Sequence, residues 1–290
     1  MAAGAAERSD TARRQGAPRR RIWLVADDYG MSPGVSAAIR DLAARGRLSA
    51  TSVMVVAPSF ARAEAQALAP RDHVAARIAV GLHLTLTAPF RPLTRGFAPT
   101  RGGAFLPLGA MMARALLGRL DRAAIAAEVA AQLAAFHDAF DRAPDYVDGH
   151  QHVQLLPVVR DALIAAVAAQ APHAWVRQCG SVAPRLADPK GVLLDRLSRG
   201  FRARAAARGI RTNPAFAGTY DFSDRTPFAE RFARFLDGLP DGGVVMCHPG
   251  HVDDELKRLD PVTDQRAREY AYLAGDDFAA VLRGQGVTLA

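Results

Sequence analysis

The chain has 290 residues, 50% of them hydrophobic and 23% charged, a globular composition that excludes disorder as its main state. Its formal net charge is +8, but the first 21 residues hold six arginines and two acidic residues, so half of the positive charge lies at the start of the chain. The rest of the sequence therefore does not indicate a clustered basic surface for nucleic acid. Two cysteines, Cys179 and Cys247, exclude a disulfide framework, and no apolar run reaches the roughly 18 residues of a membrane-spanning helix. We therefore expect a cytoplasmic protein with no nucleic-acid partner.

Residues 1–20 are rich in arginine and lack apolar periodicity, which predicts a disordered basic tail. The apolar stretch after it, Ile22–Ala26, is shorter than the roughly 7 to 15 residues of a signal sequence and ends in two aspartates, so no signal peptide is expected. The tail arginines leave a weak contact with an anionic membrane surface, at its inner face, as an open alternative. Residues 21–290 show no linker and no internal repeat, and we expect them to form one domain.

Short apolar runs alternate with helix-like stretches along this domain. Strands are predicted at residues 21–26, 51–56, 78–86, 146–153, 174–178 and 243–247. Helices are predicted at residues 35–45, 60–68, 120–140, 157–169, 191–208, 227–236 and 263–273. The longest of them has apolar residues at intervals of three and four, at Ile125, Val129, Leu133 and Phe136. This alternation predicts an α/β fold with a parallel sheet or (β/α) barrel, in which residues 88–107 and 213–223 form loops.

Two adjacent carboxylates, Asp27 and Asp28, follow the first predicted strand. In parallel α/β folds the carboxyl ends of the strands carry the ligand site, so side chains at this place are candidates for chemistry. One carboxylate of such a pair can bind a cation while its neighbour handles protons. The alternative is that both only cap the turn that follows.

Histidines mark two further strands. His83 lies in the predicted strand GLHLTLT, where the alternative is an ordinary core histidine. In the segment DGHQHV, an extended chain would place Asp148, His150 and His152 on one face. A divalent metal would satisfy such a group at once, and Asp148 could accept a hydrogen bond from a ligand histidine; a solvated polar face is the alternative.

Two more polar residues end strands. His248 follows the predicted strand GVVMC and precedes Pro249-Gly250, which fixes it at a strand tip, although turn formation alone would also explain it. Arg177 ends the predicted strand AWVRQ, where it could orient Asp27, bind sugar or simply face solvent. Aspartate and histidine ligands with one open position are what metal-assisted hydrolysis requires, because the ion must acidify a bound water and polarise a carbonyl.

Several of these motifs, in this order, resemble the YdjC-like carbohydrate deacetylases, which include the chitooligosaccharide deacetylases. The resemblance spans about residues 22–275 and rests on ADDYGMSPGV, SATSVMV, GLHLTLT, YVDGHQHVQLLP and MCHPG. The motif VDGHQHVQLLP, together with FAGTYDF, looks most like the hopanoid-biosynthesis-associated members of that family. The resemblance implies a distorted (β/α) barrel similar to that of polysaccharide deacetylases, with one divalent metal ion.

The resemblance also implies roles for individual residues. Asp28, His83 and His150 would bind the metal, Asp27 would be the general base and His248 the general acid. Asp148, His152 and Arg177 would bind substrate or contact the metal ligands and the catalytic residues and so support them. Many relatives have a histidine where this chain has Gln154, a position outside the ligand set.

We therefore expect a metal-dependent deacetylase that hydrolyses the N-acetyl group of an N-acetylglucosamine-type sugar, plausibly one attached to a hopanoid lipid. The cofactor would be one divalent ion, Mg²⁺ or Zn²⁺, and the partner an N-acetylated sugar or glycolipid; a homodimer stays open. Two alternatives remain: a hydrolase for another bond such as a phosphoester, and a sugar-binding protein with a structural metal. Phosphate chemistry usually uses two metals and a structural metal takes four protein ligands, so a count of ligands separates these functions.

Overall fold

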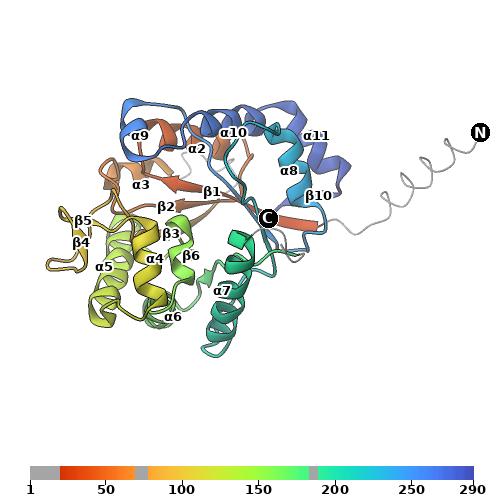
Figure 1. Ribbon diagram of the computed structural model, residues 1–290. Helices are drawn as coiled ribbons and strands as arrows, with labels where there is room; N and C mark the ends of the chain where they lie inside the picture. The colour runs from red at the N-terminus through yellow and green to blue at the C-terminus, as the bar shows by residue number, and fades with distance from the viewer. Residues whose placement is uncertain (1–19, 69–77, 183–188) are drawn as a thin grey trace, which may run out of the picture.

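A curved parallel sheet forms the centre of the molecule, as the computed structural model shows for residues 20–68, 78–182 and 189–290 (Figure 1). The strands of this sheet pair in the order β7-β6-β3-β2-β1-β9-β8, and β10 pairs with the first residues of β1. Every pairing in it is parallel. Their bounds are β1 Arg20–Tyr29, β2 Ala50–Val53, β3 Ala79–Leu84, β6 Tyr146–Gly149, β7 Trp175–Val176, β8 Phe216–Ala217, β9 Val244–Cys247 and β10 Val287–Leu289.

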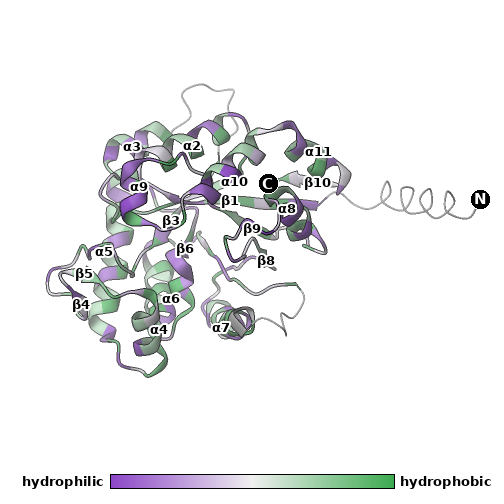
Figure 2. Cartoon of the chain, turned by 45° about the horizontal axis from the view of Figure 1, so that its top comes forward, coloured by the Kyte–Doolittle hydropathy of each residue, from purple (hydrophilic) through white to green (hydrophobic). Residues whose placement is uncertain are grey.

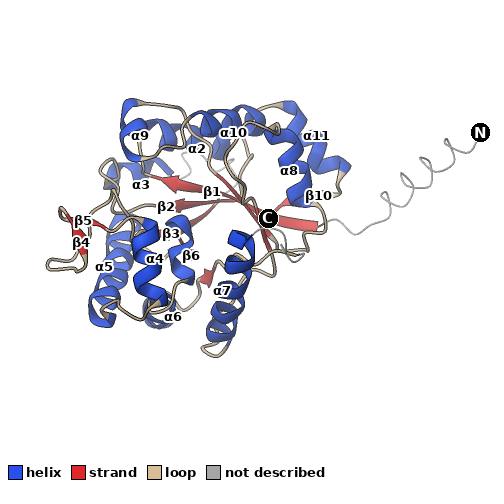
Figure 3. Cartoon of the chain, in the orientation of Figure 1, coloured by secondary structure: helices blue, strands red, loops and turns tan. Residues whose placement is uncertain are grey.

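Helices surround this half-barrel; α2, α10 and α11 lie above the strands and α5, α6 and α7 below them in Figure 3. The helices are α2 Pro33–Ala44, α3 Arg62–Leu68, α4 Leu108–Leu116, α5 Arg122–Phe140, α6 Val159–Gln170, α7 Pro189–Ala206, α8 Phe228–Leu236, α9 Asp254–Leu259, α10 Asp264–Ala274 and α11 Asp276–Gly284. The predicted α/β class and barrel-like arrangement are confirmed. Beyond β7, the described residues continue the sheet with an isolated bridge between Val176 and Thr212 instead of a full strand. The barrel is therefore distorted.

The predicted spacing of α5 is confirmed, since Ile125, Val129, Leu133 and Phe136 are all buried. Asp121 begins this helix by accepting hydrogen bonds from the amides of the next turn. Apolar positions at intervals of three and four fall on one helical face, so their burial follows directly from the sequence pattern. No helix in the described part of the chain is long and apolar enough to cross a bilayer.

Most predicted element ends differ from the structure by one to three residues, and two predicted boundaries are wrong in a way that changes which segment a residue belongs to. The strand expected to run to residue 153 ends at Gly149, because His150–Leu155 forms a short 3-10 segment in which Gln151 and His152 have φ values of 54° and 62°. Arg20, expected in the tail, is the first residue of β1, where it pairs with Val287 of the C-terminal strand. The rest of the predicted tail, residues 1–19, lies outside the described residues.

The predicted loop at residues 88–107 contains an antiparallel pair, β4 Thr100–Arg101 and β5 Ala104–Phe105. Helices α4, α9 and α11 and strand β10 are not predicted by the sequence pattern either, because each is too short to show a clear periodicity. The predicted loop at residues 213–223 includes the two-residue strand β8. These additions surround the predicted sheet without changing its order.

We expect Phe136→Ala to lower the free energy of unfolding by about 3–5 kcal/mol. Phe136 is fully buried, and its ring stacks on that of Phe140 with centroids 4.4 Å apart. Urea unfolding followed by circular dichroism measures the change. Leu117→Ala is the matched control, since Leu117 is 64% exposed and its truncation should change stability by no more than about 0.5 kcal/mol. Equal losses in the two variants would contradict the packing of α5.

Candidate functional site

The residues singled out at strand ends meet at one edge of the sheet. Asp27 and Asp28 lie near the end of β1, His83 in β3, Asp148 in β6, His150 directly after β6, and His248 directly after β9. In the sheet these strands follow the order β6-β3-β2-β1-β9. Because they are all parallel, their carboxyl ends lie at the same edge. Pairing places His83 directly opposite Asp148.

A bulge at the end of β1 brings both adjacent aspartates to this edge. The pairing of β1 with β2 shifts register between Ala26 and Tyr29, and Asp28 has a φ of 70°. In a regular strand, Asp27 and Asp28 would point to opposite faces. The bulge re-aims them, so that both carboxylates are buried in the same site.

Asp28, His83 and His150 form a compact group of potential metal ligands. The Oδ1 atom of Asp28 lies 3.3 Å from Nε2 of His83 and 3.0 Å from Nδ1 of His150, and the three ligand atoms are all within 4.8 Å of one another. All three residues are buried. Asp148 contacts Nδ1 of His83 at 2.6 Å, which leaves Nε2 of that ring directed at the group.

Asp27 is held beside this group by Arg177. The two guanidinium nitrogens lie 2.8 and 2.7 Å from the two oxygens of Asp27, and Arg177 also pairs with Asp148 at 3.0 Å. Arg177 has no exposed surface, so the alternative that it faces solvent is wrong. The predicted contact with Asp27 is confirmed. Burial raises the pKa of Asp27, but Arg177 and His83 outweigh it and hold this pKa below its usual value, so the carboxylate is ionised at neutral pH.

The chemistry of these donors fits a divalent cation. One carboxylate oxygen and two imidazole nitrogens are a ligand set found for Zn²⁺ and similar ions. Burial disfavours a charged His83, yet Asp148 and Asp27 raise its pKa to about 10, which shows that the negative potential here favours bound positive charge. A second group of potential ligands, Asp27, His83 and Asp148, is less suited to a metal because both of its carboxylates already pair with Arg177.

His248 lies beside Asp27 at the tip of β9. Its Nε2 lies 4.0 Å from Oδ2 of Asp27, and its ring packs edge-on against Phe222 with centroids 5.2 Å apart. Burial lowers the pKa of His248 to about 4, so the ring is neutral at neutral pH. Among the described residues, its buried Nδ1 has no hydrogen-bond partner.

His152 does not share the face of His150, and the prediction that it does is wrong. The left-handed backbone at Gln151 and His152 turns this ring away from the ligand group. Its Nδ1 lies 3.5 Å from the sulfur of Cys179, and burial lowers its pKa to about 3. Gln154 likewise lies outside the ligand group, where it donates to the carbonyl of Arg177 at 3.1 Å.

Sequence reasoning missed three buried residues that contact the site. Ser52 of β2 donates to Asp148, Arg266 of α10 donates to Asp28 at 2.7 Å, and Glu269 of α10 accepts from the backbone of His248. Arg266 and Glu269 are one helical turn apart in a predicted helix, so a charged pair at this spacing was the available signal. The helix pattern alone does not say what that face contacts.

Glu269 is expected to make stability depend on pH. Burial raises its pKa from 4.5 to about 7, despite the hydrogen bonds it accepts from Tyr220 and from the amide of His248. Since the folded pKa exceeds the unfolded one, the contribution to stability is fully present below about pH 4.5 and is lost as the pH rises through 7. Between pH 5 and pH 8, the wild type should lose about 2–3 kcal/mol relative to Glu269→Gln in urea unfolding. Parallel pH dependence in the two proteins would contradict this assignment.

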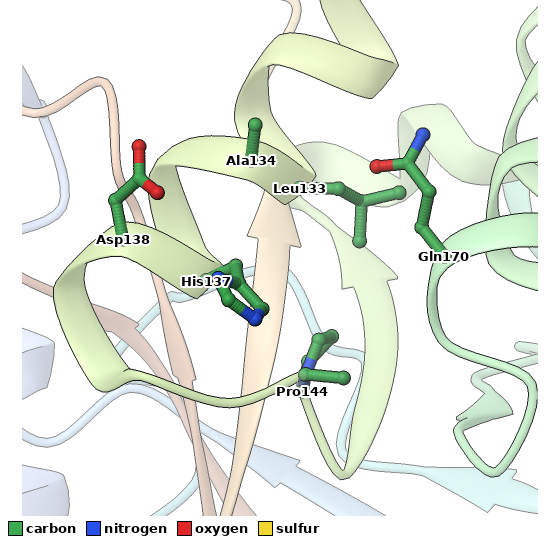
Figure 4. Close-up of a pocket in the computed structure, with 7 residues that line it drawn as sticks. Leu133, Ala134, His137, Asp138, Pro144 and Gln170 are labelled. Atoms are coloured by element: carbon green, nitrogen blue, oxygen red, sulfur yellow. The ribbon is translucent and has the colours of Figure 1, made fainter.

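A groove of about 350 Å³ lies away from this site (Figure 4). Its walls come from the last turns of α5 and α6 and from the turn before β6, including His137, Asp138, Pro144 and Gln170. Pro144 precedes β6, whereas the ligand group lies beyond the carboxyl end of that strand. The groove therefore belongs to the opposite edge of the sheet and contains none of the residues of the candidate site.

Known proteins resemble this chain over most of its length. The family model for YdjC-like protein matches residues 21–284. The chain is 32% identical over 261 residues to the carbohydrate deacetylase of Homo sapiens, an alignment that covers 81% of this chain and 76% of that protein. It is 29% identical over 239 residues to the chitooligosaccharide deacetylase of Escherichia fergusonii, with 82% and 85% covered.

A solved structure from Enterococcus faecalis, of a protein named for cellobiose-phosphate cleavage, has the same fold. It superimposes with a TM-score of 0.75 at 19% identity and covers 94% of this chain and 97% of its own. The matched family region contains the whole site, from Asp27 to Glu269. The chain therefore belongs to the YdjC-like protein family.

Proposed function

We propose that the protein is a metal-dependent carbohydrate deacetylase that hydrolyses the N-acetyl amide of an N-acetylglucosamine-type sugar. One observation carries the proposal: Asp28, His83 and His150 form an open ligand group, and Asp27 and His248 stand beside it without joining it. The names of the two curated relatives, a carbohydrate deacetylase and a chitooligosaccharide deacetylase, support the substrate class.

The divalent ion would be held by Asp28, His83 and His150, and when bound it supplies an activated water and a polarised acetyl carbonyl. Asp27, ionised and fixed in direction by Arg177, is placed to take the proton of the attacking water. His248 is placed to deliver a proton to the leaving amine. Because this ring is neutral at neutral pH, it must take up that proton during the reaction.

Only three protein ligands are available in this group within the described residues, which supports a catalytic metal over a structural one. The two imidazole nitrogens favour Zn²⁺ over Mg²⁺, because Mg²⁺ prefers oxygen ligands. Neither alternative function, phosphoester hydrolysis or sugar binding with a structural metal, gains a specific observation in its favour.

We propose further that the sugar is attached to a lipid of the hopanoid type. The motifs VDGHQHVQLLP and FAGTYDF support this finer assignment. Residues 88–120 support it too: they include five arginines and no acidic residue, Leu116 and Leu117 are exposed, and α4 is largely hydrophobic (Figure 2). Phe90 of the same segment packs edge-on against His150, so this segment reaches the site, and its exposed residues would face an anionic bilayer.

The test is to incubate metal-loaded protein with diacetylchitobiose and with N-acetylglucosaminyl hopanoid and to follow the loss of one acetyl group by mass spectrometry. Loss from both substrates supports the deacetylase, and a higher kcat/KM for the hopanoid supports the lipid assignment. Asp27→Asn is the control for contaminating activity. Turnover of chitobiose alone would reject the lipid, and turnover of neither substrate would reject this substrate class. Size-exclusion chromatography of the same sample tests whether the protein forms a homodimer.

A further inference from the structure

Helix α10 directs two buried charged side chains at the site from outside the sheet. Arg266 is 1% exposed and Glu269 is fully buried, although both are charged residues that are seldom found inside proteins. They lie three residues apart, so they extend from the same face of the helix. Each contacts a different part of the proposed machinery.

Arg266 contacts the oxygen of Asp28 that does not face the ligand group. Its Nη2 lies 2.7 Å from Oδ2 of Asp28, whereas Oδ1 of the same carboxylate faces His83 and His150. Arg266 is itself held by Asp260 and by the carbonyl of Val262 at 3.0 Å. A carboxylate anchored through one oxygen keeps its other oxygen in a fixed direction, which suits binding a metal through a single atom.

Glu269 holds the loop that carries His248. It accepts a hydrogen bond from the backbone amide of His248 and another from the hydroxyl of Tyr220. Tyr220 lies in the aromatic segment that also supplies Phe222, whose ring packs against His248. One carboxylate therefore ties the tip of β9 to the segment that covers it.

We propose that Arg266 and Glu269 are positioning residues with separate duties: Arg266 sets the metal affinity by orienting Asp28, and Glu269 sets the rate by orienting His248. This inference rests on the deacetylase function proposed above. A buried ion pair is weak support for a purely stabilising role, because the cost of taking both charges out of water offsets their attraction. Residues that only stabilised the fold would not affect metal binding and turnover separately.

The first test is metal binding, measured by calorimetric titration of metal-free protein with Zn²⁺. Arg266→Met should weaken binding by about 10- to 100-fold, the usual effect of removing a residue that supports a ligand. Arg266→Lys keeps the charge and one donor, so it should recover part of the affinity. Arg268→Met is the matched control on the same helix, because Arg268 is exposed, and it should bind Zn²⁺ like the wild type.

The second test is steady-state turnover of diacetylchitobiose at saturating Zn²⁺. Glu269→Ala should bind Zn²⁺ within about twofold of the wild type, while kcat falls by about 10- to 100-fold, since small misplacements of reacting groups have effects of this size. Glu269→Gln can still accept from the amide of His248 and should recover most of kcat. Thermal unfolding of each variant identifies any that does not fold, in which case the Lys and Gln variants carry the test.

Unchanged Zn²⁺ affinity in both Arg266 variants, or equal losses of affinity and kcat in both Glu269 variants, would overturn the inference. Wild-type protein that binds no Zn²⁺ or deacetylates no sugar would instead reject the proposed function. The two failures are therefore distinguishable from the wild-type measurements alone.

Discussion

Asp27→Asn is expected to lower kcat by about 10²- to 10⁴-fold and to leave metal affinity nearly unchanged. Asparagine keeps the shape of the side chain but cannot take up the proton. Asp27 contacts Arg177 through both oxygens and stands outside the ligand group, so its replacement removes no ligand. Excess metal should not restore the rate.

Asp28→Asn should show the reverse behaviour. It replaces a charged ligand with a neutral one, and metal affinity should fall by at least about 100-fold, more than for a residue that only supports a ligand. Its activity should recover partly at high metal concentration. Calorimetric titration together with kcat at several metal concentrations separates the two variants. If Asp27→Asn lost the metal while Asp28→Asn kept it, the assigned roles would be exchanged.

The pH profile adds an independent measurement on Asp27 and His248. With Asp27 as base and a neutral His248 that takes up its proton during the reaction, kcat/KM should fall at acidic pH, where both groups become protonated, and should stay level near neutral pH. The pKa of His248 is about 4, and that of Asp27 lies below the usual value for a carboxylate. His248→Ala should lower kcat/KM and remove the part of the acidic limb that His248 contributes; a variant with the wild-type kcat/KM would remove His248 from the role of acid.

Removal of the metal is expected to abolish turnover, and addition of Zn²⁺ should restore it. Without a cation, Asp28, His83 and His150 have no means of polarising the acetyl carbonyl. The fold should survive chelation, because its core is the sheet and the helices rather than the site. Metal at about 100 times its Kd should add about 2.7 kcal/mol to stability, which a rise in Tm would report. Full activity in protein shown by elemental analysis to be metal-free would reject the mechanism.

Local patterns in the sequence were sufficient for the fold class and for most of the candidate site. Apolar runs alternating with helical periodicity predict a parallel sheet, and carboxyl ends of parallel strands share one edge by geometry alone. Residues such as Asp28, His83 and His248, which lie at or near the ends of different strands, are therefore brought together by the strand pattern itself. Their roles as ligand, base or acid came from the family resemblance and remain to be tested.

Other features depended on contacts between distant parts of the chain. The bulge that turns Asp27 and Asp28 to one side arises where β1 pairs with β2, and the alternation rule for a regular strand does not contain it. The same rule placed His152 beside His150, and the 3-10 segment after Gly149 made that placement wrong. In both cases the backbone departs from a regular strand at or next to residues of the candidate site.

The surroundings of the site were decided by tertiary structure alone. From its sequence position, Arg177 could orient Asp27, bind sugar or face solvent, and only the folded chain shows it buried between Asp27 and Asp148. Arg266 lies 238 positions from Asp28 in the sequence, a distance over which no periodicity in either segment identifies the partner. Local sequence determines which residues share a helix face or a strand end, whereas the packing of α10 against α2 and α8 determines which buried charges meet.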